Sequence, residues 1–545
     1  MATLPVLDLH GKNTPSTISK ESSDLVTDEE KGEVAASSSA GSSEEDLLAK
    51  YYAPPSSYEG SHRWDPQATW STDELKKITR KLDLRVTFVA CICFAALQLD
   101  RGNIGNALSD GMLQDLHLTT NDYNLGQSLL YGMFLSAELP SQLISKKLGS
   151  DIWIPIQMMS WSLVAISQVG LRNKAGFYAT RALLGLLEGG FIADTILYLS
   201  YYYTADELSI RLGFFWVALT ATNVLGAFLG AGLLAMRGTH GLEGWRWLFL
   251  IEGIITFAIG LWALFYLPAG PTQTAGGFRG KGWFTEREEV IIVNKVLRDD
   301  PTKSDMHNRE GLSLRDLLNS LYDYDLWPIY ALGLTTYLAP ATINAYFSLT
   351  LKSLGFSTFQ TNMLMIPHYI IFMLLNLALV FLSKKLKERV LVSSLASWWQ
   401  LIFLIVIVTI PDAANKWIKW AILTLLLSYP YCHPLLVSLT SGNSGSVRTR
   451  TVASSVYNMS VQASSLIASN VYREDDKPYY HRGNRALIGI VCGNIVLFAL
   501  TKIYFIRRNR TRDERWNAMT PVQKEEYLKT TTDKGNKRLD FRFLH

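Results

Sequence analysis

Charge is scarce in this sequence. Of its 545 residues only 18% are Asp, Glu, Lys or Arg, whereas 48% are hydrophobic. A soluble protein typically carries roughly 25% charged residues. Three long stretches, 212–236, 253–278 and 390–411, contain no charged residue at all. Because a helix needs about 20 apolar residues to cross a bilayer, several such stretches in one chain exclude an ordinary soluble enzyme.

Cysteine and excess basic charge are also lacking. The four cysteines lie in apolar stretches, whereas a disulfide framework or a zinc site would need them clustered in loops. The net charge is only +4, and no separate basic domain is present, which argues against nucleic-acid binding as the main role. No constellation of nucleophiles or metal ligands is visible. We therefore expect neither an enzyme nor a bound metal or cofactor.

The N-terminal segment has few apolar residues. Residues 1–50 hold ten acidic and four basic residues, with a Ser-rich acidic run at 35–46. Such a composition buries too little apolar area to order the chain. The segment also lacks the basic-then-apolar order of a signal peptide. We predict that residues 1–83 form a largely disordered cytosolic tail.

Apolar segments then follow at regular intervals and predict an all-α membrane protein with twelve transmembrane helices. We place them at 84–107, 124–144, 152–170, 175–203, 211–236, 246–267, 326–351, 358–383, 389–410, 417–440, 450–471 and 485–506. The predicted domains are two six-helix bundles, 84–267 and 326–506, a cytosolic linker, 268–325, and a cytosolic C-terminal tail, 507–545. Two such halves are typical of the pseudo-symmetric repeats of secondary transporters.

The linker is expected to contain short amphipathic helices. Thr285 and Glu288 have the spacing of a capping box, in which the two side chains satisfy free N–H groups at a helix start. Apolar residues recur at helical spacing from Val290 to Leu297. A second short helix is predicted to begin near Ser313.

Basic clusters predict the orientation, since cytosolic loops retain Lys and Arg. Clusters at 146–147, 384–389, 448–450 and 507–512 all fall on the cytosolic side if both termini are cytosolic. The basic pair Arg172 and Lys174 and the mixed loop 473–485 are exceptions that these four clusters outweigh. We therefore expect both termini in the cytosol, and the plasma membrane as the default location of the protein.

The first span contains two charges, Asp100 and Arg101. An ionisable group near the bilayer centre costs at least about 2.5–3.5 kcal/mol, so it is expected to face a polar cavity or a partner. The alternative ends the helix before Asp100, but the remaining apolar run, 86–99, is too short to span. Adjacent helical residues point about 100° apart. The two charged side chains can therefore line one cavity, but they cannot both face the same partner. Asn103 lies on a helix face similar to that of Asp100.

The fourth span contains Arg181 and Glu188, which are seven residues apart and therefore lie on one helix face, with Gly185 between them. They form either a ligand site or a structural ion pair, and the two roles can coexist. Guanidinium groups bind carboxylate, sulfonate or sulfate through paired hydrogen bonds. A carboxyl group in a low-dielectric site can take up a proton near neutral pH.

These residue types predict proton-coupled uptake of a small anion. Arg101 and Arg181 would hold the anion, and Asp100 or Glu188 would carry the coupling proton, with the proton gradient as energy source. Neutral hydrogen bonds to the substrate are expected from six further residues: Asn103, Asn344, His368, Asn443, Asn458 and Gln462. A lone histidine is more often a packing residue than a ligand, and we expect a structural role for Glu252.

Several motifs carry a family resemblance: DRGNIGNA at 100–107, NDYNLGQ at 121–127, RALLGLLEGGF at 181–191, LYLSYYYT at 197–204, GWRWLFLIEG at 244–253, GPTQT at 270–274, YNMSVQASSLIASNVYREDDKPYYHRGN at 457–484 and KRLDFRFLH at 537–545. With them the chain resembles the major facilitator superfamily, and within it the fungal allantoate permease family of anion:cation symporters. One departure is the loop at 140–149, which lacks the acidic gating residue usual in the superfamily.

The resemblance implies twelve helices, proton symport and a small anionic substrate. It also implies that Asp100, Arg101, Arg181 and Glu188 form the coupling and anion site. The motifs at 121–127, 473–484 and 537–545 are most similar to fungal sulfonate and alternative sulfate transporters. The alternatives are a carrier of a carboxylate nutrient such as allantoate, pantothenate or nicotinate, and a nutrient sensor without net transport. We expect a monomer whose partners are the anion, protons and the lipid bilayer.

Overall fold

The computed structural model describes residues 53–54, 58–276, 280–299, 322–444, 447–477, 479–531, 533 and 535–545. Every regular element in these residues is helical. The first six spans are α3 (Phe88–Ser109), α5 (Thr120–Leu148), α6 (Ser150–Ser167), the pair α7 (Lys174–Glu188) and α8 (Phe191–Ser200), α9 (Ala205–Leu234) and α10 (Gly244–Tyr266).

The second six spans follow a similar order, except that their first span is also divided into two helices. They are the pair α14 (Trp327–Thr335) and α15 (Leu338–Ser353), α16 (Thr358–Leu386), α17 (Val390–Thr409), the pair α18 (Lys416–Leu427) and α19 (His433–Asn443), α20 (Val447–Ala468) and α21 (His481–Asn517). Eight of the twelve spans are long and apolar enough by composition alone to cross a membrane. The other four are either interrupted or richer in polar residues.

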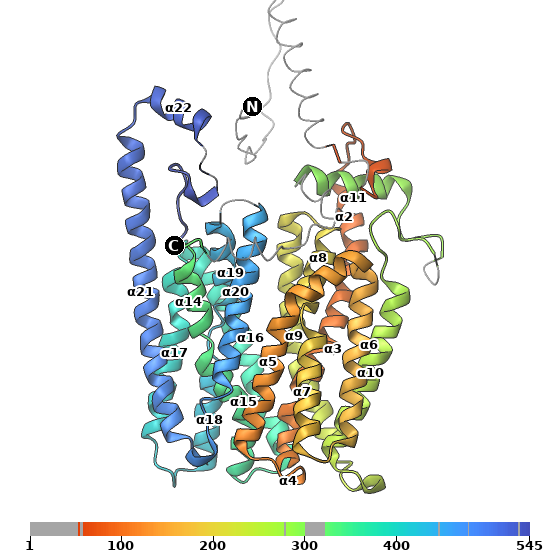
Figure 1. Ribbon diagram of the computed structural model, residues 1–545, viewed down its shortest axis with the longest axis vertical. Helices are drawn as coiled ribbons and strands as arrows, with labels where there is room; N and C mark the ends of the chain where they lie inside the picture. The colour runs from red at the N-terminus through yellow and green to blue at the C-terminus, as the bar shows by residue number, and fades with distance from the viewer. Residues whose placement is uncertain are drawn as a thin grey trace, which may run out of the picture.

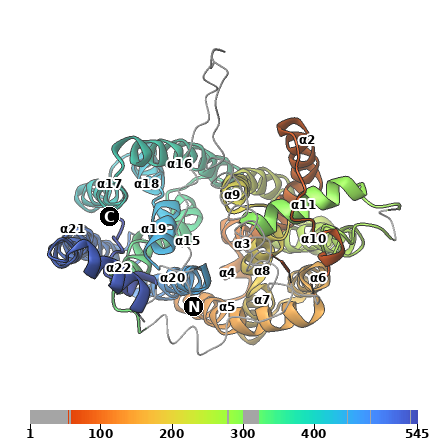
Figure 2. The same cartoon turned by 90° about the horizontal axis from the view of Figure 1, so that it is seen from above.

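The helices form two bundles that lie side by side (Figure 2). The short helices α11 (Glu286–Asp299) and α22 (Pro521–Thr530) lie at one end of the bundles, here called the linker end. The short helix α4 (Met112–Asp115) lies at the other, far end (Figure 1). The twelve predicted spans are therefore confirmed as two six-helix bundles.

Asp100 and Arg101 lie inside α3, which continues without a break to Ser109. The helix is prolonged at the linker end by α2 (Thr72–Leu82), which begins with a capping box formed by Ser71 and Glu74. The alternative in which the first span ends before Asp100 is thereby excluded. Both charges are held within a regular helix that packs against α9 and α10.

The fourth span of each bundle is broken in its middle. In the first bundle, α7 ends at Glu188 and α8 begins at Phe191, with Gly190 at φ 87°. In the second bundle, the segment 429–432 between α18 and α19 is unwound and contains Pro430. Interrupted helices at corresponding positions of two repeats are the best structural pointer to a transporter's binding site.

The linker helix α11 docks on the first bundle. Its predicted capping box is confirmed, because the Thr285 hydroxyl accepts from the Glu288 backbone N–H at 3.3 Å and the Glu288 carboxylate accepts from the Thr285 N–H at 2.9 Å. An ion pair of 2.8 Å joins Lys295 to Glu207 of α9. The second predicted linker helix, near Ser313, lies outside the described residues.

Helices α5 and α7 approach closely at Gly185. A Cβ atom at this position would lie 2.1 Å from the carbonyl oxygen of Leu130, so the backbones would have to separate. We expect Gly185→Ala to destabilise the protein by about 1–3 kcal/mol, as overpacking does in other cores. The unfolding temperature of the purified protein measures this effect.

The matched control is Gly489→Ala on α21, where an added Cβ meets no atom within 4 Å. The same substitution there should leave the unfolding temperature unchanged or raise it slightly, since alanine favours helix over glycine by about 1 kcal/mol. Equal unfolding temperatures for the two variants would contradict the packing described for α5 and α7.

Candidate functional site

A buried ion pair occupies the break in the fourth span. The Nε atom of Arg101 on α3 lies 2.8 Å from Oε2 of Glu188, the last residue of α7. The Glu188 side chain is 2% exposed and that of Arg101 is 22% exposed. The Arg101 guanidinium also lies 4.6 Å from the centre of the Phe134 ring. The first helix of the bundle is thus tied to the broken helix at the point where the chain leaves α7.

Arg181 lies deeper in the same bundle and is only 2% exposed. Its guanidinium donates to Oε1 of Gln168 at 2.5 Å, while its Nε has no hydrogen-bond partner among the described residues. Glu188 shares a helix face with Arg181, as predicted, but its ion pair is made with Arg101 instead. Arg181 therefore keeps a free donor in a region that already contains a buried carboxylate.

Tyr131 of α5 is a site residue that the sequence does not indicate. It lies within electrostatic range of Arg101, Arg181 and Glu188. A tyrosine hydroxyl can donate to an anion held by two guanidinium groups. Burying an uncharged aromatic residue in an apolar span costs little free energy, so the sequence gives no reason to single out Tyr131. The packing of α5 against α7 places it beside the charged residues.

Asp100 points away from this pair. Its Oδ2 accepts from the indole N–H of Trp161 on α6 at 3.0 Å, and it remains within electrostatic range of Glu188. Asn103, predicted on a similar face, is 1% exposed and lies beside Glu252 of α10. The two adjacent charges of α3 therefore face different neighbours: Arg101 faces α7, and Asp100 faces α6 and α10.

The residues predicted in the second bundle are dispersed. Asn344 is exposed on α15, and Asn458 and Gln462 are half-buried on α20. The His368 ring is buried in α16 and packs on Tyr369, with ring centres 3.8 Å apart. The structure does not bring His368 to the arginines; it places this histidine in an aromatic packing environment.

Asn443 lies at the linker end, where the C-terminal tail docks. Its amide donates to the Leu544 carbonyl at 3.0 Å and its Oδ1 accepts from the Leu544 N–H at 2.8 Å. Its own carbonyl accepts from Asn536 at 3.0 Å. These bonds occupy both atoms of the amide, so the structure assigns Asn443 to tail docking and not to the group around Arg101.

An aromatic cluster beside the break in the tenth span is a second feature that the sequence analysis does not predict. The Tyr431 and His433 rings are stacked at 5.5 Å, and the Tyr337 and Tyr457 hydroxyls are 3.2 Å apart. His433 also contacts Trp216 of α9, at 5.5 Å between ring centres, so the cluster reaches across to the first bundle. The sequence feature that could have indicated this cluster is the pair Pro430 and Pro434 inside an apolar span.

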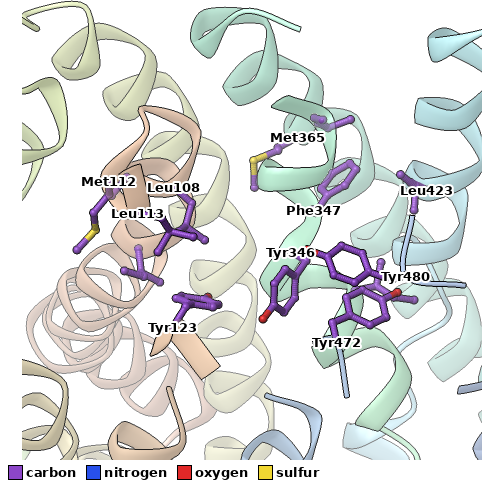
Figure 3. Close-up of a cluster of buried hydrophobic side chains, with 14 of the residues drawn as sticks. Leu108, Met112, Leu113, Tyr123, Tyr346, Phe347, Met365, Leu423, Tyr472 and Tyr480 are labelled. Carbon is purple, nitrogen blue, oxygen red and sulfur yellow. The ribbon is translucent and has the colours of Figure 1, made fainter. Parts of the chain in front are cut away.

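The two bundles are bonded to each other at the far end. The Asn124 amide of α5 donates to the Tyr472 carbonyl at 2.7 Å and its Oδ1 accepts from the Tyr346 hydroxyl. The backbone N–H of Thr120 donates to Glu474 at 2.6 Å. Figure 3 shows Tyr346 between Tyr123 and the stacked rings of Tyr472 and Tyr480, which are 4.3 Å apart. These contacts join the two bundles at the far end and are called the closure below.

Glu474 lies in this closure and is expected to make it sensitive to pH. Burial opposes ionisation of Glu474, but its ion pair with Lys477 and its bonds from Thr120 outweigh burial and hold its pKa below the ordinary value. A lowered pKa means that Glu474 stabilises the closure above its ordinary pKa, near 4.3, and that this contribution is lost as the pH falls through the lowered value. Glu474→Gln should mimic this loss at neutral pH.

A cysteine in place of Ser128, which bonds Asn470 across the closure at 2.7 Å, reports the opening. In a background without the four native cysteines, Glu474→Gln should accelerate labelling of this cysteine by a membrane-impermeant maleimide. The neighbouring change Asp475→Asn should not, because Asp475 pairs with Arg482 of its own bundle. Equal labelling rates in all three proteins would contradict a role for Glu474 in the closure.

Two bundles of six helices, with a charged site at broken central helices, define a multi-pass membrane transporter. The family comparison agrees: residues 90–469 match the model of the Major Facilitator Superfamily, and the chain belongs to this family. It is 48% identical over 493 residues to an uncharacterized transporter of Saccharomyces cerevisiae, covering 90% of this chain and 91% of that protein. It is 27% identical over 478 residues to an MFS-type transporter of Penicillium expansum, covering 86% and 90%.

Solved structures share the fold at low sequence identity. A bacterial homologue of the human lysosomal transporter Spinster, inward-facing and occupied, has a TM-score of 0.59 at 12% identity, covering 77% of this chain and 97% of its own. The xylose transporter XylE of E. coli, in a partially occluded inward-open conformation, has a TM-score of 0.56 at 12% identity, covering 76% and 96%. The all-helical fold of the superfamily is thereby confirmed.

Proposed function

We propose that the protein is a secondary active transporter that couples the uptake of a small anion to protons. The observation that carries this proposal is the buried pair of Arg101 and Glu188, with the free Nε of Arg181 nearby, at the break of the fourth span. Two guanidinium groups facing one carboxylate leave a positive charge for which an anionic ligand is the natural counterion.

Competition between Glu188 and the anion for Arg101 would couple the proton flux to the anion flux. When Glu188 is ionised it occupies the Arg101 guanidinium, as in this structure. When Glu188 takes up a proton the ion pair is lost, and Arg101 becomes free to bind the anion together with Arg181. Loss of the proton on the other side restores the ion pair and displaces the anion. Alternating access then requires only that the bundles rock about this site.

The substrate class rests on the sequence motifs. Their similarity to fungal sulfonate and alternative sulfate transporters favours a sulfonate, sulfate or other sulfur-containing anion. A carboxylate such as allantoate, pantothenate or nicotinate has the same two-oxygen geometry for an arginine and is the alternative. Tyr131 would add a neutral donor to either group.

We further propose that the protein is a monomer in the plasma membrane, with both termini and α11 in the cytosol. The basic clusters of the sequence support this orientation. The far end is then extracellular, and the closure at Asn124 and Glu474 separates the site from the outside. The structure would accordingly represent an inward-facing state.

An uptake assay tests the proposal. A fungal strain deficient in anion uptake, expressing the protein, should accumulate one of labelled sulfate, a taurine-like sulfonate, allantoate or pantothenate, and more so at acidic external pH. A growth screen on sole sulfur and nitrogen sources widens the choice of anion. Absence of uptake for every anion at every pH would contradict transport, and a signalling response that survives Arg181→Ala would favour a sensor.

A further inference from the structure

Four buried side chains between α3 and α10 have polar atoms whose polar neighbours belong to the same group. They are Oδ1 of Asp100, both amide atoms of Asn103, both carboxylate oxygens of Glu252 and the hydroxyl of Thr256. None of these atoms forms a hydrogen bond of good geometry with any residue that the structure describes. Their side chains belong to residues that are at most 8% exposed, and Glu252 and Thr256 are fully buried.

The four side chains converge on one place. Thr256 lies beside Asp100, and Asn103 lies beside Glu252, so that each helix contributes one carboxyl group and one neutral group. The spacing explains the arrangement: residues 100 and 103 on α3, and 252 and 256 on α10, are one helical turn apart and therefore share a face. Trp161 closes the group from α6 through its bond to Asp100.

No lysine or arginine in the part of the chain that the structure describes forms an ion pair with Asp100 or Glu252. On α3, Arg101 is bonded to Glu188, and on α9, Arg211 is bonded to Asp83. The electrostatic influence on Glu252 comes from Asp100, a group of the same sign. Leaving two carboxylates ionised and side by side in a membrane-spanning bundle costs several kcal/mol per uncompensated charge. A small cation held between them removes this cost.

We propose that Asp100 and Glu252 share a bound proton in a site completed by Asn103 and Thr256. A proton fits because it neutralises one of the two carboxylates and so removes the repulsion between them, and the protonated group can donate a hydrogen bond. The site differs from the ion pair of Arg101 and Glu188, because Asp100 and Arg101 point about 100° apart on α3, although Glu188 remains within electrostatic range of Asp100. Its use in driving transport rests on the function proposed above, whereas its occupancy does not.

Infrared difference spectroscopy of the purified full-length protein in lipid nanodiscs tests the occupancy. Titration from neutral to alkaline pH should remove the carbonyl stretch of a protonated carboxyl group. Because the proton is shared, Glu252→Gln and Asp100→Asn should each change the frequency of this band and the pH at which it disappears. The control Glu138→Gln, a buried carboxyl of α5 outside the cluster, should leave it in place. An unchanged band in Glu252→Gln would overturn the proposal.

Two further measurements test the proposal even if the carboxyl variants fold poorly. Thr256→Val retains both carboxyl groups and should shift the pH at which the band disappears. Loss of the band on adding sodium chloride, but not potassium chloride, at constant pH would overturn the proton and assign the site to sodium. If the band behaves as expected while no anion is transported, the function proposed above fails and the proton site stands.

Discussion

Replacing Glu188 with glutamine is expected to abolish accumulation of the anion against its gradient while sparing exchange of internal for external anion. Glutamine cannot release a proton, so Arg101 would no longer be recaptured by a carboxylate on the cytosolic side. The bundles can still rock with the anion bound, because the amide preserves the shape of the side chain. Counterflow and pH-driven accumulation in proteoliposomes separate the two activities.

The control for this variant is Glu138→Gln, which also neutralises a buried carboxyl group of the first bundle. Glu138 forms no ion pair among the described residues, so both activities should persist. Accumulation that survives Glu188→Gln would remove Glu188 from the coupling role. Loss of exchange together with accumulation would mean that the carboxylate is needed for binding or folding and not for coupling.

Replacing Arg101 with glutamine is expected to weaken anion binding strongly. Hydrogen bonds to charged groups contribute about 1.5–3 kcal/mol, so the loss corresponds to roughly 10- to 150-fold in affinity. The same change leaves the carboxylate of Glu188 buried without a partner, which destabilises the fold by about 3–5 kcal/mol. Equilibrium binding of the labelled anion and the unfolding temperature measure the two effects separately.

The double variant Arg101→Gln with Glu188→Gln distinguishes binding from stability. Removing both charges should restore the unfolding temperature, because Glu188 is then no longer a buried carboxylate without its partner. Anion binding should stay weak, because the guanidinium is still absent. Recovery of binding in the double variant would show that Arg101 supports the fold and does not contact the anion.

The sequence predicted the charged part of the site because helix geometry fixes it. Asp100 and Arg101 are inside a span, and Arg181 and Glu188 share a face, as their spacing requires. The partner of each charged residue was not predictable, because the Arg101–Glu188 pair depends on where the fold places α3 relative to α7. Glu252 was assigned a structural role, since spacing alone does not reveal that α10 places it beside Asp100.

Polar residues of the second bundle were harder to place. From the sequence alone, the amide of Asn443 could bind a ligand or another part of the chain. In the structure it bonds to the C-terminal tail, about 100 residues further along the chain. Contacts of that separation leave no local pattern. The unwound segment at 429–432 did leave a local pattern, in Pro430 within it and Pro434 just after it, and the stacked Tyr431 and His433 rings lie at this break.

Proton-driven uptake by the purified protein tests the central claim most directly. Proteoliposomes containing the full-length chain, with an acidic exterior and a neutral interior, are supplied with the labelled anion identified by the growth screen. The account predicts that the internal concentration rises above the external one and that a protonophore collapses it. Uptake that merely equilibrates, with or without the pH gradient, would contradict proton coupling at the Arg101–Glu188 site.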